Sequence, residues 1–178
     1  VHKLFKKEND INFTIETDKN VYYSRICAIA IGMMGKPNKP SYKIPASLIK
    51  TCINYDITSK QIRDSKVLVV GGGDSASEYA QYLCLSGNDV KLCYRQPEFK
   101  RMNDINKESL EALEKQEKIE LYMSCDIEEV KVSESGEKPL VCFKGDGYAE
   151  EEFDQIVFAL GGTTPTNFLK LLGIEFDG

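Results

Sequence analysis

The chain has 178 residues, of which 42% are hydrophobic and 29% charged, and its formal net charge at pH 7 is −5. This length and composition fit one medium-sized globular domain with flanking pieces, large enough to bury a hydrophobic core. The acidic balance argues against general nucleic-acid binding, which needs a basic face, and no apolar run approaches the roughly 18 residues that span a bilayer.

The first predicted elements are two strands, over residues 12–17 and 20–31. Asp18-Lys19-Asn20 is expected to form the hairpin turn between them. Residues 47–55 predict a short helix, to which no function is assigned.

The run over residues 67–78 is the most informative part of the chain. Residues 67–70 are four apolar residues, three of them β-branched, and this pattern predicts a buried parallel strand. The strand leads directly into Gly71-x-Gly73-x-x-Ala76, and the residues after it predict a helix. A strand, a glycine turn and a helix in this order are typical of a dinucleotide-phosphate site.

Each small residue of the turn has an expected role. Gly71 allows the tight turn, Gly73 lets the backbone approach a pyrophosphate, and Ala76 keeps the helix close to the strand. The first helical N–H groups and the helix dipole then favour the negative charge of the phosphates. The residues assigned to cofactor binding here are Gly71, Gly72, Gly73, Asp74, Ser75 and Ala76.

The following strand, over residues 90–94, indicates which nucleotide is bound. A site for NAD(H) usually ends this strand with Asp or Glu, whereas Asp89 lies before the strand and reads as a turn residue. The strand ends in Tyr94-Arg95-Gln96, and Arg101 follows, so guanidinium groups suited to a 2′-phosphate are present where no carboxylate is. The pattern favours NADP(H) over NAD(H), with a solvated cluster of surface cations as the alternative.

Further along, Asn103 or Asp104 is expected to cap a helix that reaches about Lys118, with Ile105, Leu110 and Leu113 facing inward. Residues 119–123 predict a third parallel strand. After Cys125 the chain is expected to make a three-stranded antiparallel excursion, with turns at residues 136–138 and 145–147.

The last part of the excursion carries three consecutive glutamates, residues 150–152, which are expected to form an exposed acidic edge that discourages strand pairing. Residues 155–160 predict the last parallel strand. Gly161 and Gly162 would let the backbone pass close to the nicotinamide half of the cofactor.

Cysteine and histidine usage restricts the chemistry. The six cysteines show no metal-ligand spacing, and Cys27, Cys84 and Cys93 are expected to be reduced core residues. Cys52 has no partner in its own stretch, and whether it is redox-active stays open. With a single histidine, His2, nucleophilic or metal chemistry that depends on histidine is disfavoured, so no catalytic residue and no metal site are assigned. Hydride transfer fits this absence, because the cofactors supply the reacting atoms.

Residues 67–101 resemble the NADPH-binding domain of the thioredoxin reductase-like pyridine nucleotide-disulfide oxidoreductases, which are flavoproteins with two dinucleotide-binding domains. The glycine turn of this family commonly reads Gly-Gly-Gly-Asp-Ser-Ala, as residues 71–76 do. Its second strand commonly ends His-Arg-Arg, with Phe-Arg a few residues later, where this chain has Tyr94-Arg95-Gln96 and then Phe99-Lys100-Arg101. The resemblance implies that Glu78 lies beside the nicotinamide carboxamide, although an ordinary exposed helix residue is an equal reading.

The resemblance extends to both sides of this region. In the family the nucleotide domain is inserted into an FAD domain, so the chain crosses between the two domains twice. Residues 26–32 resemble the outgoing strand that ends Ala-Thr-Gly, with Ile31 in place of Thr, and the proline-rich residues 37–45 would be the linker. Residues 156–162 and the following 163–169 resemble the return crossing.

The fold class that the resemblance implies is α/β. We expect a Rossmann-like NAD(P)-binding domain of three layers, with a parallel sheet and an antiparallel β excursion, flanked by partial FAD-domain segments. The expected boundaries are residues 1–40 for a partial FAD-domain β segment and linker, 41–162 for the NAD(P)-binding domain, and 163–178 for the return segment.

The chain lacks some features of the family. It has no initiator Met and no second glycine fingerprint near its start, so we read it as a piece of a longer flavoprotein. It also lacks a Cys-x-x-Cys pair before the glycine strand. The resemblance is therefore closer to subfamilies without that pair, such as ferredoxin-NADP reductases of this type and bacillithiol-disulfide reductase-like proteins.

The function implied is delivery of hydride from NADPH to an FAD that is held mostly by other sequence. The expected partners are a nicotinamide dinucleotide and the FAD domain of the same chain, with a homodimer left open for the full-length form and with no nucleic acid or membrane. No secretory signal is visible, so a cytoplasmic location is expected. The alternative is a nucleotide-binding sensor or regulatory module without redox turnover, and a domain for another adenine nucleotide fits less well. The electron acceptor does not follow from the sequence.

Overall fold

The computed structural model of the chain describes all residues except 2, 8–9, 30–36, 145–146, 163–165 and 172–178. The chain divides into two compact units. One unit comprises residues 1–36 and 162–178, and the other comprises residues 37–161.

The smaller unit contains an antiparallel sheet of three strands, β1 (Lys3–Lys6), β2 (Phe13–Glu16) and β3 (Val21–Ser24), paired in that order. The predicted hairpin is confirmed, since the Thr17 amide donates to the Asn20 carbonyl oxygen across the turn at 2.9 Å. The prediction of a strand up to residue 31 is wrong within the described residues. β3 stops at Ser24, whose hydroxyl donates to the Ile26 carbonyl oxygen at 2.6 Å.

Parts of the two predicted crossings lie outside the described residues. This applies to residues 30–32 of the outgoing crossing and to residues 163–165 of the return crossing. Strand β1 and helix α4 (Thr166–Leu171) are elements that the sequence pattern did not predict. His2 is also outside the described residues.

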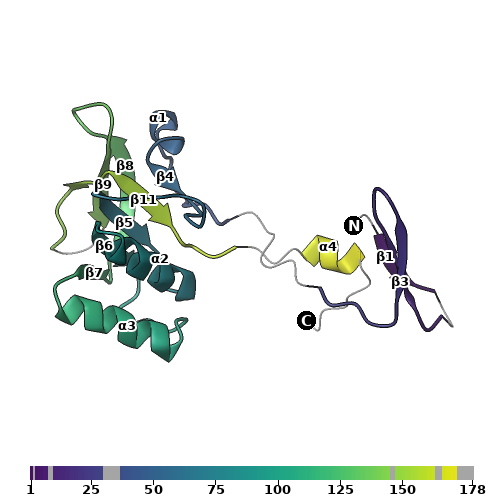
Figure 1. The fold of residues 1–178 in the computed structure, drawn as a ribbon. Coiled ribbons are helices and arrows are strands. Elements are labelled where there is room, and N and C mark those ends of the chain that lie inside the picture. Colours follow the sequence, from purple (N-terminus) through teal and green to yellow (C-terminus); the bar gives the residue numbers. More distant parts are fainter. Residues whose placement is uncertain (2, 8–9, 30–36, 145–146, 163–165, 172–178) are drawn as a thin grey trace. The chain divides into compact units, whose positions relative to one another are not determined.

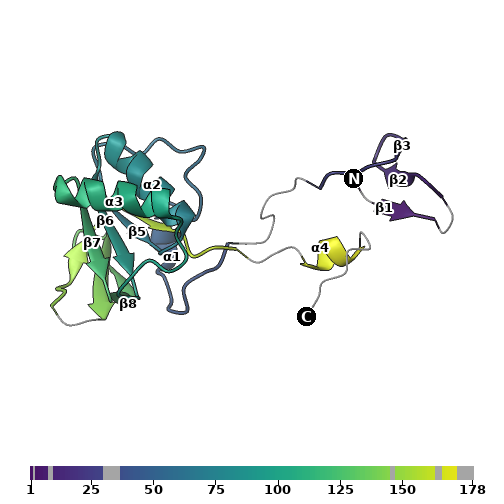
Figure 2. The same ribbon diagram turned by 90° about the horizontal axis from the view of Figure 1, so that it is seen from below.

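The larger unit is built on a five-stranded sheet in which all neighbouring strands are parallel. In sheet order the strands are β4 (Ile53–Asn54), β11 (Gln155–Phe158), β5 (Lys66–Val70), β6 (Asp89–Tyr94) and β7 (Ile119–Met123). Helices α2 (Asp74–Leu85) and α3 (Asp104–Lys115) lie together on one face of this sheet (Figure 1). An antiparallel sheet of β10 (Glu151–Glu152), β9 (Pro139–Lys144) and β8 (Asp126–Val132) lies on the other side, as the second view makes clear (Figure 2). The expected three-layer α/β fold with an antiparallel excursion is confirmed.

The side chains of β5 show how the layers are held together. Val67 and Val69 belong to a hydrophobic cluster shared with α2 and α3, whereas Leu68 and Val70 belong to a cluster shared with β8 and β9. A strand that is buried on both faces reads as a continuous apolar run, which is why residues 67–70 were recognisable as a parallel strand.

The predicted helix over residues 47–55 is only partly confirmed. Helix α1 (Ala46–Ile49) is four residues long, and the chain then forms β4 at the edge of the parallel sheet. The Ile156 amide donates to the Cys52 carbonyl oxygen at 2.8 Å, so pairing with β11 takes precedence over local helix preference here.

Helix α3 begins as predicted and ends three residues earlier than expected. The side chain of Asn103 accepts a hydrogen bond from the Asn106 amide at 2.9 Å and so caps the helix. Leu110 is fully buried and Leu113 packs at the margin of the core, as expected. The prediction that Ile105 faces inward is wrong, because this side chain is 78% exposed in the first turn.

The expectation of an exposed acidic edge over residues 150–152 that discourages strand pairing is partly confirmed, since Glu150 and Glu152 are exposed and β10 is an edge strand of its sheet. β10 pairs with β9, and Glu151 is a half-buried residue whose carboxylate lies 2.8 Å from the ammonium groups of both Lys66 and Lys91. The same carboxylate accepts a hydrogen bond from the Tyr122 hydroxyl at 3.0 Å. Glu151 therefore joins the excursion to the face of the parallel sheet.

The excursion and the last strand otherwise follow the prediction closely. The first turn is confirmed at Gly136, where φ is +79°. Residues 145–146 of the second turn are outside the described residues. β11 ends at Phe158, two residues before the predicted end of the last strand.

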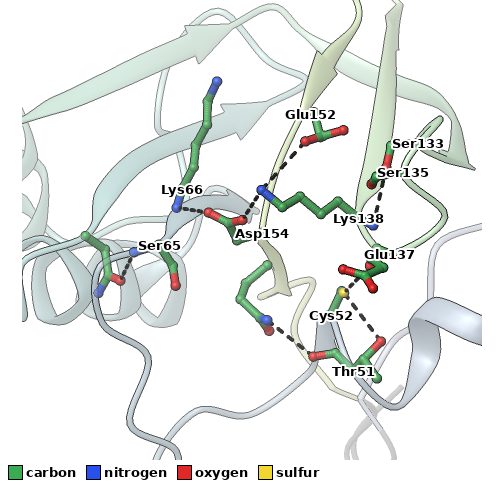
Figure 3. A network of polar contacts seen from close by, with 12 residues as sticks. Thr51, Cys52, Ser65, Lys66, Ser133, Ser135, Glu137, Lys138, Glu152 and Asp154 are labelled. Carbon is green, nitrogen blue, oxygen red and sulfur yellow. Dashed lines mark hydrogen bonds and ion pairs between the residues drawn. The ribbon is translucent and has the colours of Figure 1, made fainter.

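A polar network closes the amino-terminal ends of the parallel strands (Figure 3). Asp154, just before β11, accepts a hydrogen bond from the Lys66 amide at 2.7 Å, and its other carboxylate oxygen lies 2.9 Å from the Lys138 ammonium. This network ties the β8–β9 turn to the starts of β5 and β11. The glycine turn follows β5 and so lies at the opposite, carboxyl-terminal edge.

No helix within the described ranges is long and apolar enough to cross a membrane.

Candidate functional site

The glycine turn lies at the carboxyl-terminal edge of the parallel sheet, between the ends of β11 and β6, which is where open α/β sheets bind their ligands. Gly71 has a φ of +152°, and a Cβ on it would lie 2.4 Å from the Ala159 carbonyl oxygen and 3.2 Å from the Ala76 Cβ. Gly71 is therefore required by the close passage of β11 and α2. Ala76 is fully buried at this contact, as expected for the residue that keeps helix and strand together.

Gly72 meets a different neighbour. A Cβ at this position would lie 2.2 Å from the ring of Tyr94, so the Tyr94 ring packs directly on the turn. The ring also stacks on Phe99, with centroids 5.4 Å apart and an interplanar angle of 11°. The aromatic pair therefore fixes the chain that leaves β6 against the glycine turn.

Gly73 faces open space. Its backbone is extended, with φ −110° and ψ −177°, and a Cβ built on it would meet no other atom within 4 Å. Neither backbone conformation nor packing within the described chain demands glycine here. The space beside this backbone is therefore open to a group from outside the chain.

The start of α2 adds hydrogen-bond donors to this open face. Gly73 is the N-cap residue and no side chain caps the helix, while Ala76 and Ser77 donate their amides to the Gly73 carbonyl oxygen at 3.0 and 3.2 Å. A helix start without a side-chain cap keeps donor capacity and the positive end of the helix dipole for an anion. Ser75 and Glu78, two further predicted site residues, are exposed on the first two turns of this helix.

The predicted cationic residues are brought to the same place. The backbone of Arg101 forms a parallel bridge with Gly73, and Arg95 directly follows Tyr94 at the end of β6. Both arginine side chains are exposed, and within the described residues neither guanidinium pairs with a carboxylate. Gln96 is exposed as well, and its carbonyl oxygen accepts the Ser124 amide at 3.1 Å. The loop from Arg95 to Asn103 thus presents two unpaired cations beside the turn.

Asp74 is turned toward α3. Its Oδ1 accepts hydrogen bonds from the Asn103 amide at 2.9 Å, from the Asn103 side chain at 2.6 Å and from the Asn106 side chain at 3.0 Å. These bonds, with that from the Asn106 side chain the strongest influence, hold the pKa of the Asp74 carboxyl below its usual value. The carboxylate that the sequence placed in the cofactor site is engaged by the neighbouring helix.

The end of β11 forms the other side of the site. Gly161 has a φ of +76° and is exposed. Asn38 holds this segment through two hydrogen bonds. Its backbone N–H donates to the Gly161 carbonyl oxygen at 3.0 Å, and its side-chain nitrogen donates to the Leu160 carbonyl oxygen at 3.1 Å. Gly162 falls in the other compact unit.

Sequence reasoning missed several residues that shape this edge. Asn38, Asn103 and Asn106 act through contacts between distant segments, and no local pattern singles them out. Tyr55, at the end of β4, stacks on Phe158 with ring centroids 5.6 Å apart. An aromatic residue beside a two-residue strand carried no signal in the sequence.

The cysteines lie outside this edge or within the core. All six thiols are free. Cys93 is buried as predicted, while Cys27 and Cys84 are only half-buried. Cys52 is buried at the amino-terminal end of β4, where its thiol contacts the Thr51 hydroxyl and the Glu137 carbonyl oxygen, both at 3.4 Å (Figure 3). No group of three or more potential metal ligands occurs among the residues that the structure describes.

Comparisons with known proteins place this geometry in context. A family model described as pyridine nucleotide-disulphide oxidoreductase matches residues 1–178. Bacilliredoxin reductase Bdr of Bacillus subtilis (strain 168) is 30% identical over 177 residues, which cover 96% of this chain and 51% of that protein. Ferredoxin–NADP reductase 2 of Christiangramia forsetii is 29% identical over 180 residues, covering 98% of this chain and 51% of that protein. The chain spans about half the length of the curated relatives it matches.

Solved structures share the fold at lower identity. Thioredoxin reductase of T. acidophilum superposes with a TM-score of 0.74 at 21% identity, over 99% of this chain and 56% of that one. Bacillithiol disulfide reductase Bdr (YpdA) of Staphylococcus aureus superposes with a TM-score of 0.67 at 23% identity, over 98% of this chain and 53% of that one.

Proposed function

Because this chain belongs to the pyridine nucleotide-disulphide oxidoreductase family, we propose that its larger unit binds NADP(H) and presents the nicotinamide to an FAD held by the same protein. The larger unit, residues 37–161, would be the nucleotide domain. The smaller unit, with its antiparallel sheet, would be part of the FAD domain. The whole protein would be an FAD-dependent oxidoreductase.

One observation carries the proposal, namely the open face of Gly73 at the start of α2, which no side chain caps. A pyrophosphate lying there would meet backbone amides and the positive end of the helix dipole, with no side chain in its way. Gly71 and Gly72, by contrast, are explained by contacts within the chain. Gly73 also suits its N-cap position, but neither a positive φ nor a close contact within the described chain requires glycine there.

The preference for the phosphorylated nucleotide is proposed from the end of β6. In a site of this kind the adenine ribose lies beyond the second strand, which here is β6. Tyr94, Arg95 and Gln96 follow that strand with no acidic residue among them, and Arg101 is bridged to Gly73. Two guanidinium groups without carboxylate partners suit a 2′-phosphate, which Arg grips with paired hydrogen bonds. The name of one relative, a ferredoxin–NADP reductase, mentions the same nucleotide and supports this choice.

The nicotinamide half is proposed to extend toward the end of β11. When bound, the nicotinamide supplies the hydride, so the chain need only hold and orient it. Gly161, fixed by Asn38, leaves the backbone uncovered at this end, and Glu78 is exposed on the second turn of α2. We assign to the segments around Gly161 and Glu78 the role of orienting the nicotinamide ring.

Cys52 has no part in the proposed mechanism. It lies at the amino-terminal edge of the sheet, opposite the glycine turn, and its thiol contacts no other cysteine. The electrons would therefore leave the flavin for an acceptor that this chain does not hold. The six free thiols suit a reducing compartment, which supports a cytoplasmic location.

The proposal can be tested on this chain by isothermal titration calorimetry with NADP⁺ and NAD⁺. NADP⁺ should bind more tightly, and Arg101→Ala should weaken NADP⁺ binding by roughly 10- to 100-fold, the usual effect of losing a charge-assisted hydrogen bond, while NAD⁺ binding changes little. Equal affinities would remove the 2′-phosphate assignment. Failure of both nucleotides to bind would overturn the proposal.

A further inference from the structure

Asp74 occupies the centre of the glycine fingerprint, yet one of its two carboxylate oxygens is bonded to residues at the start of another helix. A single oxygen, Oδ1, accepts three hydrogen bonds, all from Asn103 and Asn106 at the start of α3. An acidic side chain beside a phosphate site would repel the phosphate if it faced it. Here the three donors hold the negative charge on the side of α3.

The two asparagines are themselves fixed by the start of α3. The Asn103 side chain caps α3 through its oxygen while its nitrogen donates to Asp74, so both ends of its amide group are used. The carbonyl oxygen of Asn106 accepts a hydrogen bond from the Ser77 hydroxyl of α2 at 3.0 Å. The amino-terminal ends of α2 and α3 are therefore locked together through Asp74.

The loop from Arg95 to Asn103 is held at both ends, and this lock is the hold at its second end. At its first end, Tyr94 packs on Gly72 and stacks on Phe99. At its other end, Asn103 is held by Asp74, only two residues after Arg101, whose backbone is bridged to Gly73. Met102, between them, is buried in the core beneath α2 and α3.

We propose that Asp74 is a positioning residue for nucleotide selectivity. It holds the segment 101–103 against the glycine turn, so that the Arg101 guanidinium stays beside the place of the 2′-phosphate, without itself touching the nucleotide. The inference rests on the proposed NADP(H) site and names the residue that sets its preference. Removal of the Asp74 carboxylate releases segment 101–103 from the glycine turn. This weakens the interaction between Arg101 and the 2′-phosphate, while the pyrophosphate site at Gly73 and the start of α2 stays in place.

The test compares the affinities of NADP⁺ and NAD⁺ for the wild-type chain, Asp74→Ala and Asp74→Asn by calorimetry. Asp74→Ala should weaken NADP⁺ binding roughly tenfold and NAD⁺ binding by less than about twofold to threefold, so the selectivity ratio falls. Asp74→Asn keeps an acceptor oxygen toward the Asn103 amide and should restore much of the ratio. A merely structural role would lower both affinities together and leave the ratio unchanged.

Asp154→Ala is the matched control. Asp154 also accepts a backbone amide from another element, that of Lys66 at 2.7 Å, but at the opposite edge of the sheet. This variant should lower the melting temperature and leave the selectivity ratio as in the wild type. If Asp74→Ala does not fold, Asn106→Ala removes one of the three donors and should shift the ratio in the same direction by a smaller factor.

The outcomes separate the two proposals. A wild-type chain that binds neither nucleotide overturns the proposed function, and one with no preference for NADP⁺ removes the 2′-phosphate assignment and this inference with it. A wild-type preference that survives Asp74→Ala, or an equal loss for both nucleotides, overturns the role of Asp74 alone.

Discussion

At the scale of single residues, the three adjacent glycines of the turn have three different surroundings. Gly71 combines a positive φ with the carbonyl oxygen of Ala159, just after β11, at a distance that excludes any Cβ. Gly72 lies under the Tyr94 ring, and Gly73 faces open space in an ordinary extended conformation. Substitutions in the same fingerprint should therefore separate folding from binding.

We predict that Gly73→Val folds normally and loses both NADP⁺ and NAD⁺, because the new side chain fills the space of the pyrophosphate. Circular dichroism should show a folded protein whose melting temperature is at most slightly lowered, since Val is a poorer N-cap residue than Gly, and calorimetry should show no heat of binding. Retained affinity in the folded variant would mean that the diphosphate lies elsewhere.

The companion substitution Gly71→Ala should behave in the opposite way. Its Cβ would lie 2.4 Å from the Ala159 carbonyl oxygen at a φ of +152°, so we expect the free energy of unfolding to fall by about 2–4 kcal/mol. Urea denaturation measures this loss. A stability equal to that of the wild type would show that the chain around Ala159 can move away from a Cβ at residue 71 without cost.

At the scale of elements, the three layers are joined by a small set of charges as well as by apolar packing. Glu151 of β10 reaches across to Lys66 of β5 and Lys91 of β6, and its side chain is only 19% exposed. Burial alone would raise the pKa of Glu151, but the hydrogen bonds from Lys66, Lys91 and Tyr122 outweigh burial and lower it. The amide of Lys66 and the ammonium of Lys138 likewise lower the pKa of Asp154.

We predict that Glu151→Gln lowers the free energy of unfolding at pH 7 by about 1–3 kcal/mol, since two ammonium groups lose a half-buried partner. Chemical denaturation followed by circular dichroism gives the value. Glu152→Gln is the control. Glu152 is the next residue of β10, its side chain is 45% exposed, and its carboxylate lies 3.7 Å from the Lys138 ammonium. An equal effect of the two substitutions would contradict the role given to Glu151.

The same carboxylates give a pH dependence of stability. Their pKa values are lower in the folded than in the unfolded state, so the unfolded chain binds more protons and the stabilisation is present above the unfolded values, near pH 4. It is lost as the pH falls through the lower folded values. We expect the melting temperature to hold between pH 7 and about 5 and to fall below about pH 4, with a shallower fall in Glu151→Gln. A parallel fall in both proteins would assign the acid sensitivity to other groups.

Local pattern was sufficient for the elements whose residues are buried on regular faces. β5, α2, β6 and β7 were predicted because the apolar runs and glycine turn reflect burial that repeats along the chain. Pattern failed at β4, at Ile105 and at Glu151, where the outcome depends on pairing with segments distant in sequence. The site divides in the same way. Residues of the fingerprint and the arginines could be found from spacing, whereas Asn38, Asn103 and Asn106 are defined only by the folded chain.

At the scale of the whole molecule, the chain comprises a three-layer unit and a second, smaller unit formed by both ends of the chain. A nucleotide domain inserted into another domain has this connectivity, since the chain must leave the outer domain and return to it. The chain also spans about half the length of its curated relatives. Nucleotide binding, the part of the proposed activity assigned to the larger unit, can therefore be examined on this chain.

For a full-length protein that contains this chain, we predict a yellow, flavin-bound preparation. NADPH should bleach the flavin absorbance near 450 nm faster than NADH does, because hydride delivery follows nucleotide binding at the glycine turn (the wavelength is roughly that of oxidised flavins in general). A colourless protein that binds NADP⁺ without any redox change would instead indicate a sensor or regulatory module.

We propose above all that the amide-lined turn from Gly71 to Ser75 holds the diphosphate of a dinucleotide, and a crystal structure of this chain with NADP⁺ would show whether it does. We expect the pyrophosphate against the open face of Gly73 and the start of α2, with the 2′-phosphate beside Arg95 and Arg101. Electron density for the nucleotide at any other place, with this turn vacant in the same crystal, would show that the turn is not the binding site.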